Sequence, residues 1–243
     1  MPAGIIYIEE TDSTNNYLKQ LLSIDDLEEG TIVHTDYQST GKGQQGNSWE
    51  SERGKNLLFS ILLFPQNIKA NEQFIISQTV SLAVADFLSQ YTDNITIKWP
   101  NDIYWKDKKI CGILIENTLQ GEQIKDSVCG IGVNINQEVF ESSAPNPVSL
   151  KQITSQEYNL QVLLKQIKEY LSHYHSLLKQ NDFDSIRNKY KSMLYRKDGY
   201  YLYNDGIQDF SARIKEIEIN GMLVLETSNR IERRFAFKEI IYR

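Results

Sequence analysis

Three apolar runs that alternate like β-strands follow one another closely between residues 95 and 136, and their spacing limits the fold more than any other feature of the chain. The runs are ITIKW (95–99), KICGILIEN (109–117) and SVCGIGVNIN (127–136), and the polar segment KDKK (106–109) leads into the second. Antiparallel strands can be joined by a tight turn, whereas parallel strands need a crossover of roughly a dozen residues or more. We therefore predict hairpins here, in a mixed or antiparallel sheet rather than a doubly wound one.

Helices with an apolar stripe are predicted before and after these strands in the sequence. They span residues 14–22, 71–91, 160–178 and 183–193, and two more strands are predicted at 30–38 and 57–65. After Tyr195 the pattern changes to short strands separated by Asn-Asp-Gly and Asn-Gly turns, which is typical of a small barrel. The predicted fold class is α+β, with a central mixed or antiparallel sheet and flanking helices in residues 1–194 and a small β-barrel in residues 195–243.

Composition excludes several classes of protein. The net charge of −6 argues against non-specific nucleic-acid binding, which needs a basic face. The N-terminus lacks the features of a signal peptide, and no run approaches the roughly 18 apolar residues of a membrane span. With only Cys111 and Cys129 the chain cannot build a disulfide framework or a four-cysteine zinc site, so both are predicted to be buried thiols. We expect a cytoplasmic protein that binds neither DNA nor membranes.

The loop GKGQQG (41–46) is the first candidate site. Its glycine spacing matches a dinucleotide-binding fingerprint, but no acidic residue follows about 20 positions later and the next segment is not helical. What remains is that glycines let backbone N–H groups approach an anion, while Lys42 adds a positive charge. An exposed surface loop without a ligand is the alternative.

Two lysines flank the predicted hairpin. Lys98 precedes the turn WPND (99–102), and Lys109 opens the next strand. A hairpin would bring both ammonium groups to one edge of the sheet, where they would repel each other unless an anion lay between them. The pattern therefore predicts a negatively charged ligand, while residues 106–108 are expected to form a solvated hairpin tip.

Five motifs follow in order along the first 136 residues: Asp12-Ser-Thr-Asn15, the loop from Gln38 through GKGQQG to Trp49, Lys98-Trp-Pro-Asn-Asp102, Lys109-Ile-Cys-Gly-Ile-Leu-Ile-Glu116 and Gly130-Ile-Gly-Val-Asn-Ile-Asn136. Their order and spacing resemble those of biotin–protein ligases. The resemblance implies a catalytic domain like that of class II aminoacyl-tRNA synthetases, followed by an SH3-like barrel. It points to the monofunctional class, because there is no room before residue 10 for a winged-helix DNA-binding domain.

The resemblance also implies an activity. The family joins biotin to a lysine of a biotin carboxyl carrier protein or domain through biotinyl-5′-AMP, with ATP and Mg²⁺, and its members are monomers or homodimers. Lys109 matches the catalytic lysine that bridges the biotin carboxylate and the α-phosphate. The implied biotin-binding residues are Ser13, Thr14, Asn15, Gln38, Lys42, Gly43, Gln44, Lys109 and Gly112. The implied ATP- or adenylate-binding residues are Gly41, Lys42, Gln44, Trp49, Lys98, Asn101, Asp102 and Asn134. No metal ligand is implied.

One departure from the family is visible in the glycine loop. The family usually has Gly-Arg-Gly-Arg-x-Gly, whereas Lys42 and Gln44 replace the two arginines here. Glutamine lacks the fixed guanidinium fork, so we expect Gln44 to hold the adenylate less firmly than arginine would. We also hypothesise that the barrel, through Arg233 or Arg234, helps to close the nucleotide site.

Several alternatives stay open at this point. A lipoate or octanoate ligase shares the fold and a catalytic lysine, and a non-enzymatic biotin sensor would keep the pocket without the transfer step. Structural roles are the alternatives for single residues: a helix cap for Ser13 or Thr14, the core for Trp49 and Trp99, and a strand end for Asn134.

Overall fold

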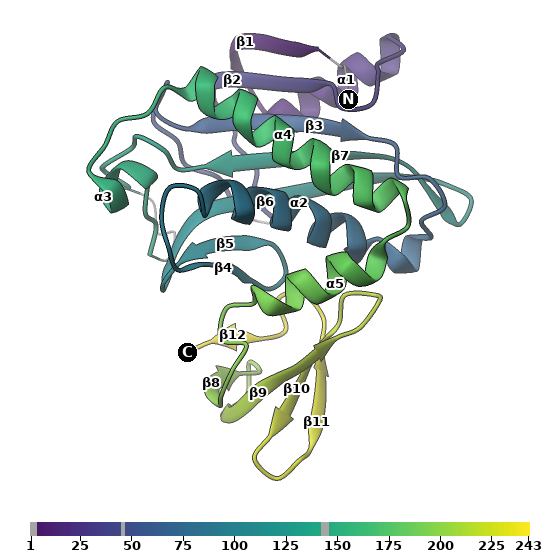
Figure 1. Ribbon diagram of the computed structural model, residues 1–243, viewed down its shortest axis with the longest axis vertical. Helices are drawn as coiled ribbons and strands as arrows, with labels where there is room; N and C mark the ends of the chain where they lie inside the picture. Colours follow the sequence, from purple (N-terminus) through teal and green to yellow (C-terminus); the bar gives the residue numbers. More distant parts are fainter. Residues whose placement is uncertain (1–3, 45–46, 142–145) are drawn as a thin grey trace.

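The computed structural model describes residues 4–44, 47–141 and 146–243, which form two β-sheets with helices around the larger one (Figure 1). The larger sheet contains β1 (Ile5–Thr11), β2 (Ile32–Gln38), β3 (Leu57–Leu63), β4 (Ile95–Lys98), β5 (Asp102–Trp105), β6 (Lys108–Gln120) and β7 (Gln123–Val133). Its strand order is β1-β2-β3-β7-β6-β5-β4. β1 and β2 pair in parallel and the other neighbours pair antiparallel, so the predicted mixed sheet is confirmed.

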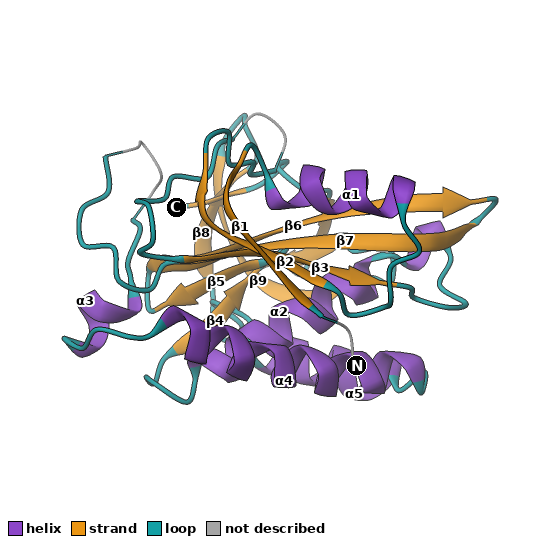
Figure 2. Cartoon of the chain, turned by 90° about the horizontal axis from the view of Figure 1, so that it is seen from above, coloured by secondary structure: helices purple, strands orange, loops and turns teal. Residues whose placement is uncertain are grey.

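Helices cover both faces of this sheet. They are α1 (Thr14–Ile24), α2 (Phe74–Leu88), α3 (Leu150–Thr154), α4 (Leu160–Lys179) and α5 (Phe183–Ser192), with a 3₁₀ turn at Ala70–Glu72. Figure 2 shows α1 on one side of the strands and α2, α4 and α5 on the other. No helix in the described part of the chain has the length and apolar character needed to cross a bilayer.

The burial of β3 follows from its sequence. Its run Leu57–Leu63 is apolar at six of seven positions and buried at all of them, because one face meets α1 and the other meets α2. Leu62 packs with Leu18 of α1, whereas Phe59 belongs to the larger core on the α2 side. Since side chains alternate along a strand, Ser60 shares the α1 face with Leu62. This polar residue in the middle of an apolar strand lies close to the cavity described below.

The sequence prediction omitted some elements and merged others. β5 and α3 were not expected because each is short, and β1 was not expected because its apolar residues are adjacent and do not alternate. Among the short strands expected after Tyr195, the last stretch, 233–243, is divided between β11 (Glu232–Phe235) and β12 (Ile241–Tyr242). Predicted helices and the remaining predicted strands are confirmed within a few residues.

The second sheet contains β8 (Tyr201–Asn204), β9 (Asp209–Ile217), β10 (Leu223–Thr227), β11 and β12, in the order β11-β10-β9-β8-β12. All of its pairs are antiparallel. A second antiparallel sheet at the C-terminus is therefore confirmed, while its closure into an SH3-like barrel and the domain boundary at residue 195 stay predictions.

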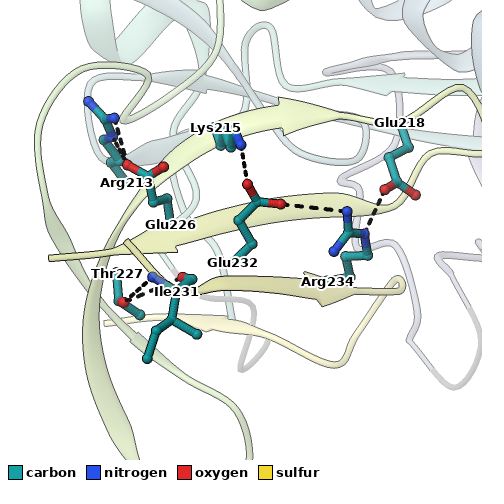
Figure 3. A network of polar contacts seen from close by, with 8 residues as sticks. All are labelled: Arg213, Lys215, Glu218, Glu226, Thr227, Ile231, Glu232 and Arg234. Atoms are coloured by element: carbon teal, nitrogen blue, oxygen red, sulfur yellow. Dashed lines mark hydrogen bonds and ion pairs between the residues drawn. The ribbon is translucent and has the colours of Figure 1, made fainter. Parts of the chain in front are cut away.

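Charged side chains cover one face of this second sheet (Figure 3). The pairs are Arg213–Glu226, Lys215–Glu232, Arg234–Glu232 and Arg234–Glu218. Arg213–Glu226 joins the adjacent strands β9 and β10, whereas Lys215–Glu232 reaches across β10 from β9 to β11. Exposed pairs of this kind stabilise a sheet only modestly. Arg234 is thus held in a surface network, and Arg233 pairs with Asp205 over the ring of Phe210. Neither arginine lines the cavity described below, and closure of the nucleotide site by the barrel stays a hypothesis.

Aromatic side chains join the two sheets. The indole Nε1 of Trp99 donates to the carbonyl of Gly221 at 3.0 Å, and the Trp99 ring packs against Phe237. Phe74 of α2 contacts Phe237 as well. Trp99 is 4% exposed, so the alternative that it is a core residue is confirmed.

Glu29 links the segment before β2 to α4, and it gives the fold a predictable response to acid. Its carboxylate accepts from the backbone of Phe64 and from Lys179, and it lies 3.0 Å from the Nε2 atom of His175. Burial opposes ionisation of this carboxyl, but the three contacts outweigh burial and lower the pKa of Glu29 from 4.5 to about 2. The stabilisation is therefore complete above about pH 4.5 and is lost as the pH falls towards 2.

We expect the free energy of unfolding to fall by about 1–3 kcal/mol over this pH window through Glu29, and Glu29→Gln to remove that part of the slope. Urea unfolding at several pH values measures it. Glu28→Gln, at the exposed neighbouring carboxyl, is the matched control and should keep the wild-type slope. Identical slopes for both variants would contradict the assignment.

Candidate functional site

A cavity of about 120 Å³ opens on the α1 face of the large sheet. Its walls come from the start of α1, the end of β2, the loop after β2, and the central parts of β6 and β7. The lining residues are Ser13, Thr14, Asn15, Gln38, Lys42, Gly43, Gln44, Asn47, Ser48, Trp49, Asp102, Lys109, Gly112, Ile113, Leu114, Gly130, Ile131 and Gly132. Lys109 and Leu114 are separated by roughly 17 Å along an extended strand, so the cavity has two distinct ends.

Neutral polar groups form the end near α1. Thr11 and Gln38 are partners at the ends of the parallel strands β1 and β2, which brings Gln38 to the first turn of α1. There the Oε1 atom of Gln38 accepts from the backbone N–H of Thr14 at 2.8 Å and lies 3.1 Å from its hydroxyl. Ser13 occupies the N-cap position, but its side chain makes no capping hydrogen bond. The cap of this helix is therefore supplied partly by Gln38, and the hydroxyl of Ser13 faces the cavity instead.

Two paired glycines form the floor. Gly112 of β6 and Gly132 of β7 are partners across the sheet, and the indole of Trp49 lies over both. A Cβ atom at Gly112 would lie 2.7 Å from the Trp49 ring, and one at Gly132 would lie 2.5 Å from it. Gly112, an implied biotin-binding residue, thus leaves room for the Trp49 ring.

The indole N–H of Trp49 is buried and is left without a hydrogen-bond acceptor among the described residues. An orphaned buried donor costs about 1–3 kcal/mol. A Cβ atom at Gly132 would lie 2.7 Å from this Nε1 atom, so the orphaned donor faces the glycine floor.

The glycine loop is folded back on itself as a small hairpin. Lys42 bridges to Ser48, the backbone N–H of Gly43 donates to Asn47, and that of Trp49 donates to Gly41. Gln45 and Gly46 at its tip lie outside the described residues. This hairpin places Lys42, Gly43 and Gln44 in the cavity lining, and it uses the N–H of Gly43 internally rather than leaving it for an anion.

Side chains of the hairpin make polar contacts at the rim. The ammonium of Lys42 donates to the Oδ1 atom of Asn16 at 2.8 Å, and the amide of Gln44 donates to Asn101 at 3.1 Å. Asn101 in turn donates to the carbonyl of Ile113 at 2.8 Å. Gln44 therefore connects the glycine loop to the turn between β4 and β5.

Lys109 brings a positive charge to the other end of the cavity. Its Nζ atom lies 2.7 Å from the Oδ1 atom of Asp102 and 5.7 Å from the centre of the Trp49 ring. One carboxylate contact leaves the ammonium group with further protons to donate. Lys109 is thus positioned to contact an anion that enters beside Trp49.

Lys98 lies near enough to Lys109 for the two charges to interact, but it stands outside the cavity lining. Its ammonium donates to the hydroxyl of Tyr104 at 3.1 Å and lies 4.9 Å from the rings of both Tyr104 and Tyr242. Burial, the largest influence, lowers the pKa of Lys98, and the charge of Lys109 adds to this. Lys98 does not line the cavity, and Asp102 supplies the negative charge that was expected from a ligand between the two lysines.

Most of the predicted residues come together. The lining includes Ser13, Thr14, Asn15, Gln38, Lys42, Gly43, Gln44, Trp49, Asp102, Lys109 and Gly112, whereas Gly41, Lys98, Asn101 and Asn134 lie outside it. Asn134 is buried beyond the end of β7, where its amide donates to the carbonyl of Val148 at 3.2 Å. That contact agrees with the alternative that Asn134 satisfies a strand end.

Some lining residues were missed. They are Asn47, Ser48, Ile113, Leu114, Gly130, Ile131 and Gly132. Strand alternation could have found part of this set, because Gly130 and Gly132 share a face of β7 and belong to a motif that was recognised as a whole.

Comparisons with known proteins agree with this arrangement. The sequence matches the biotin/lipoate A/B protein ligase family over residues 7–134. It is 34% identical to the bifunctional ligase/repressor BirA of Escherichia coli over 136 residues, which are 56% of this chain and 41% of that protein. It is 32% identical to the biotin–protein ligase of Homo sapiens over 184 residues, covering 68% of this chain and 25% of that protein. The chain therefore matches less than half the length of these relatives.

Solved structures extend the similarity to the whole chain. The biotin protein ligase from Aquifex aeolicus in complex with biotin and ATP has a TM-score of 0.79 and 25% sequence identity, and it covers 99% of this chain and 98% of its own. The biotin protein ligase from Leishmania major in complex with biotinyl-5-AMP shares the fold, with a TM-score of 0.68 at 18% identity.

Proposed function

The chain belongs to the biotin/lipoate A/B protein ligase family, and on this premise we propose that it uses ATP to join biotin to a specific lysine of a biotin carrier protein. One observation carries the proposal: a single cavity combines a neutral hydrogen-bonding end at Thr14 and Gln38 with a cationic end at Lys109. Biotin has the complementary chemistry, with a neutral ureido ring at one end and a carboxylate at the other.

The first step would form the adenylate. A carboxylate oxygen of biotin attacks the α-phosphorus of ATP, and the bond to pyrophosphate breaks, giving biotinyl-5′-AMP. Both reactants are anions, so fixed positive charge lowers the barrier most effectively. We assign this role to Lys109, because its ammonium lies in the cavity and is held by Asp102 at 2.7 Å.

The second step would transfer the acyl group. The ε-amine of the acceptor lysine attacks the acyl carbon of the mixed anhydride, AMP leaves with the bonding electrons, and the new amide loses a proton. The acceptor would be a biotin carboxyl carrier protein or domain. A cytoplasmic location for this reaction stays a prediction.

We assign the remaining residues by their place in the cavity. Ser13, Thr14, Asn15, Gln38 and Gly43 would surround the biotin head group, with Gly112 shaping the floor. Gln44, Trp49 and Asp102 would face the adenylate, and Lys42, whose ammonium lies 2.8 Å from Asn16 of α1, would lie nearer the head group. Four residues proposed to contact the nucleotide are not part of the cavity lining, so their contacts would form beyond the cavity. They are Gly41, Lys98, Asn101 and Asn134.

Mg²⁺ is proposed as the ion that accompanies ATP. The carboxylate of the lining, Asp102, is already paired with Lys109. The described residues contain no group of three or more His, Cys, Asp or Glu that could hold a metal ion. These residues do not fit a protein-held metal centre, so no step is assigned to one.

The departure at Gln44 leads to a prediction about release of the intermediate. Gln44 donates to the neutral Asn101 at 3.1 Å, and a hydrogen bond from a charged donor is worth about 1.5–3 kcal/mol. We expect Gln44→Arg to slow release of biotinyl-5′-AMP by roughly 10-fold or more, because a guanidinium can pair with the phosphate. A chase of labelled adenylate with unlabelled ligand measures the off-rate, and an unchanged rate would contradict this expectation.

The function itself is tested by mass spectrometry. Wild-type protein incubated with ATP, biotin and an apo carrier domain should add one biotinyl group to the carrier. A parallel reaction with lipoate should leave the carrier mass unchanged, because a dithiolane ring offers no partners to the polar end of the cavity. An unchanged carrier mass with biotin would contradict the proposal and would favour a sensor.

A further inference from the structure

We propose that Ser60, Asn15 and Glu116 form a directed hydrogen-bond chain beneath the cavity, and that this chain fixes which atoms of the polar end accept and which donate. The inference rests on the proposed function for the identity of the ligand. It assigns a positioning role to two residues, Ser60 and Glu116, that are not in the cavity lining.

The chain crosses three strands of the sheet. The hydroxyl of Ser60 on β3 lies 2.7 Å from the hydroxyl of Thr14 and 2.6 Å from the Oδ1 atom of Asn15. The Nδ2 atom of Asn15 then donates to the carboxylate of Glu116 on β6 at 2.7 Å. Glu116 is paired at its other oxygen with Lys19.

Gly130 makes this crossing possible. It lies on β7 between its partners Ser60 and Leu114 on the neighbouring strands. A Cβ atom at Gly130 would lie only 2.4 Å from the Oδ1 atom of Asn15. The side chain of Asn15 therefore passes over β7 through the space that the glycine leaves open.

The acceptors at one end set the direction of the whole chain. The Nδ2 side of Asn15 faces the Leu114 carbonyl and the Glu116 carboxylate, which can only accept, so this side must carry the NH₂ group. The Oδ1 atom consequently faces Ser60, and the single hydroxyl proton of Ser60 must point to it. The oxygen of Ser60 can then only accept from the hydroxyl of Thr14, because two oxygens 2.7 Å apart without a proton between them repel each other.

This direction determines what the cavity offers a ligand. The hydroxyl of Thr14 lies 2.7 Å from Ser60 and 3.1 Å from the Oε1 atom of Gln38, so its proton points to the nearer oxygen, that of Ser60. The remaining lone pairs of Thr14 can then only accept. The Oε1 atom of Gln38 is committed to the backbone N–H of Thr14, so the free amide of Gln38 can only donate. An acceptor beside a donor matches the adjacent N–H and C=O groups of a cyclic urea.

Glu116→Gln tests the chain, because the new amide can donate towards Asn15 and allow the chain to reverse. A reversed chain passes a proton from Ser60 to Thr14 and releases the proton of Thr14 towards the cavity. We expect biotin to bind roughly 10-fold more weakly to Glu116→Gln in calorimetric titrations, the loss of about one hydrogen bond. Glu122→Gln, the same substitution at an exposed carboxyl of the β6–β7 hairpin, is the matched control and should bind biotin as the wild type does.

A ligand pair separates positioning from general damage. The second ligand is the cyclic carbamate analogue of biotin, in which one ring N–H is replaced by oxygen. Wild type should prefer biotin over this analogue by roughly 10-fold, and Glu116→Gln should lose most of that preference. An unchanged ratio of the two affinities would overturn the inference, whether or not both affinities fall together. Failure of the wild type to bind biotin at all would instead contradict the proposed function.

Discussion

Replacing Lys109 by alanine is expected to slow formation of biotinyl-5′-AMP by about 100- to 1,000-fold, the usual cost of removing one fixed donor from a developing charge. In the structure the ammonium of Lys109 lies beside the Trp49 ring and is held by Asp102. Its removal leaves the carboxylate of Asp102 facing two anionic substrates. The loss should therefore appear in the chemical step, while the polar end of the cavity still binds the ureido ring.

Single-turnover release of pyrophosphate measures this step. Lys108→Ala is the matched control, because Lys108 is exposed and precedes Lys109 on the same strand. It should react at the wild-type rate. If Lys109→Ala forms the adenylate as fast as Lys108→Ala does, Lys109 is not the catalytic cation.

The second large effect is expected at Gly132. In Gly132→Ala the new methyl group would lie 2.5 Å from the Trp49 ring, so the indole must move away from the floor. Stacking of an aromatic side chain on a base is worth about 1–3 kcal/mol, so affinity for the adenylate should fall roughly 10- to 100-fold. Gly4→Ala is the control, because no atom lies within 4 Å of a Cβ atom there.

A double-mutant cycle identifies the cause of this loss. If Gly132→Ala acts by displacing Trp49, then Trp49→Ala should cost about the same, and the two changes together should cost little more than either alone. Additive losses would show that Gly132 acts on the ligand independently of Trp49.

The strands and helices were largely predictable because their apolar periods are strong. The short turns between residues 95 and 136 predicted the antiparallel part of the sheet, and the order of five motifs predicted the residues that gather around the cavity. β1 was missed, because a parallel edge strand that is exposed on one side has no clear apolar alternation. The omission of β1 from the prediction mattered, because pairing with β1 places Gln38 of β2 beside Thr14.

The details of the site depend on register and side-chain direction, which a single sequence does not contain. Gly112 and Gly132 each belong to a motif that the sequence analysis identified. Their pairing under Trp49, however, depends on the register of β6 and β7. Likewise, the hairpin was expected to bring Lys98 and Lys109 together around a ligand. Asp102 supplies that negative charge within the protein, and Lys98 contacts Tyr104 and Tyr242 instead.

The pairing of β3 with β7 also constrains how the protein acquires its binding site during synthesis. Gly132, one of the two floor glycines beneath Trp49, pairs with Leu58 of β3, so the floor is complete only after the ribosome has produced both segments. Such distant pairings form slowly, because the intervening chain must first be ordered. If the proposed function holds, biotin should protect only chains that already include Gly132.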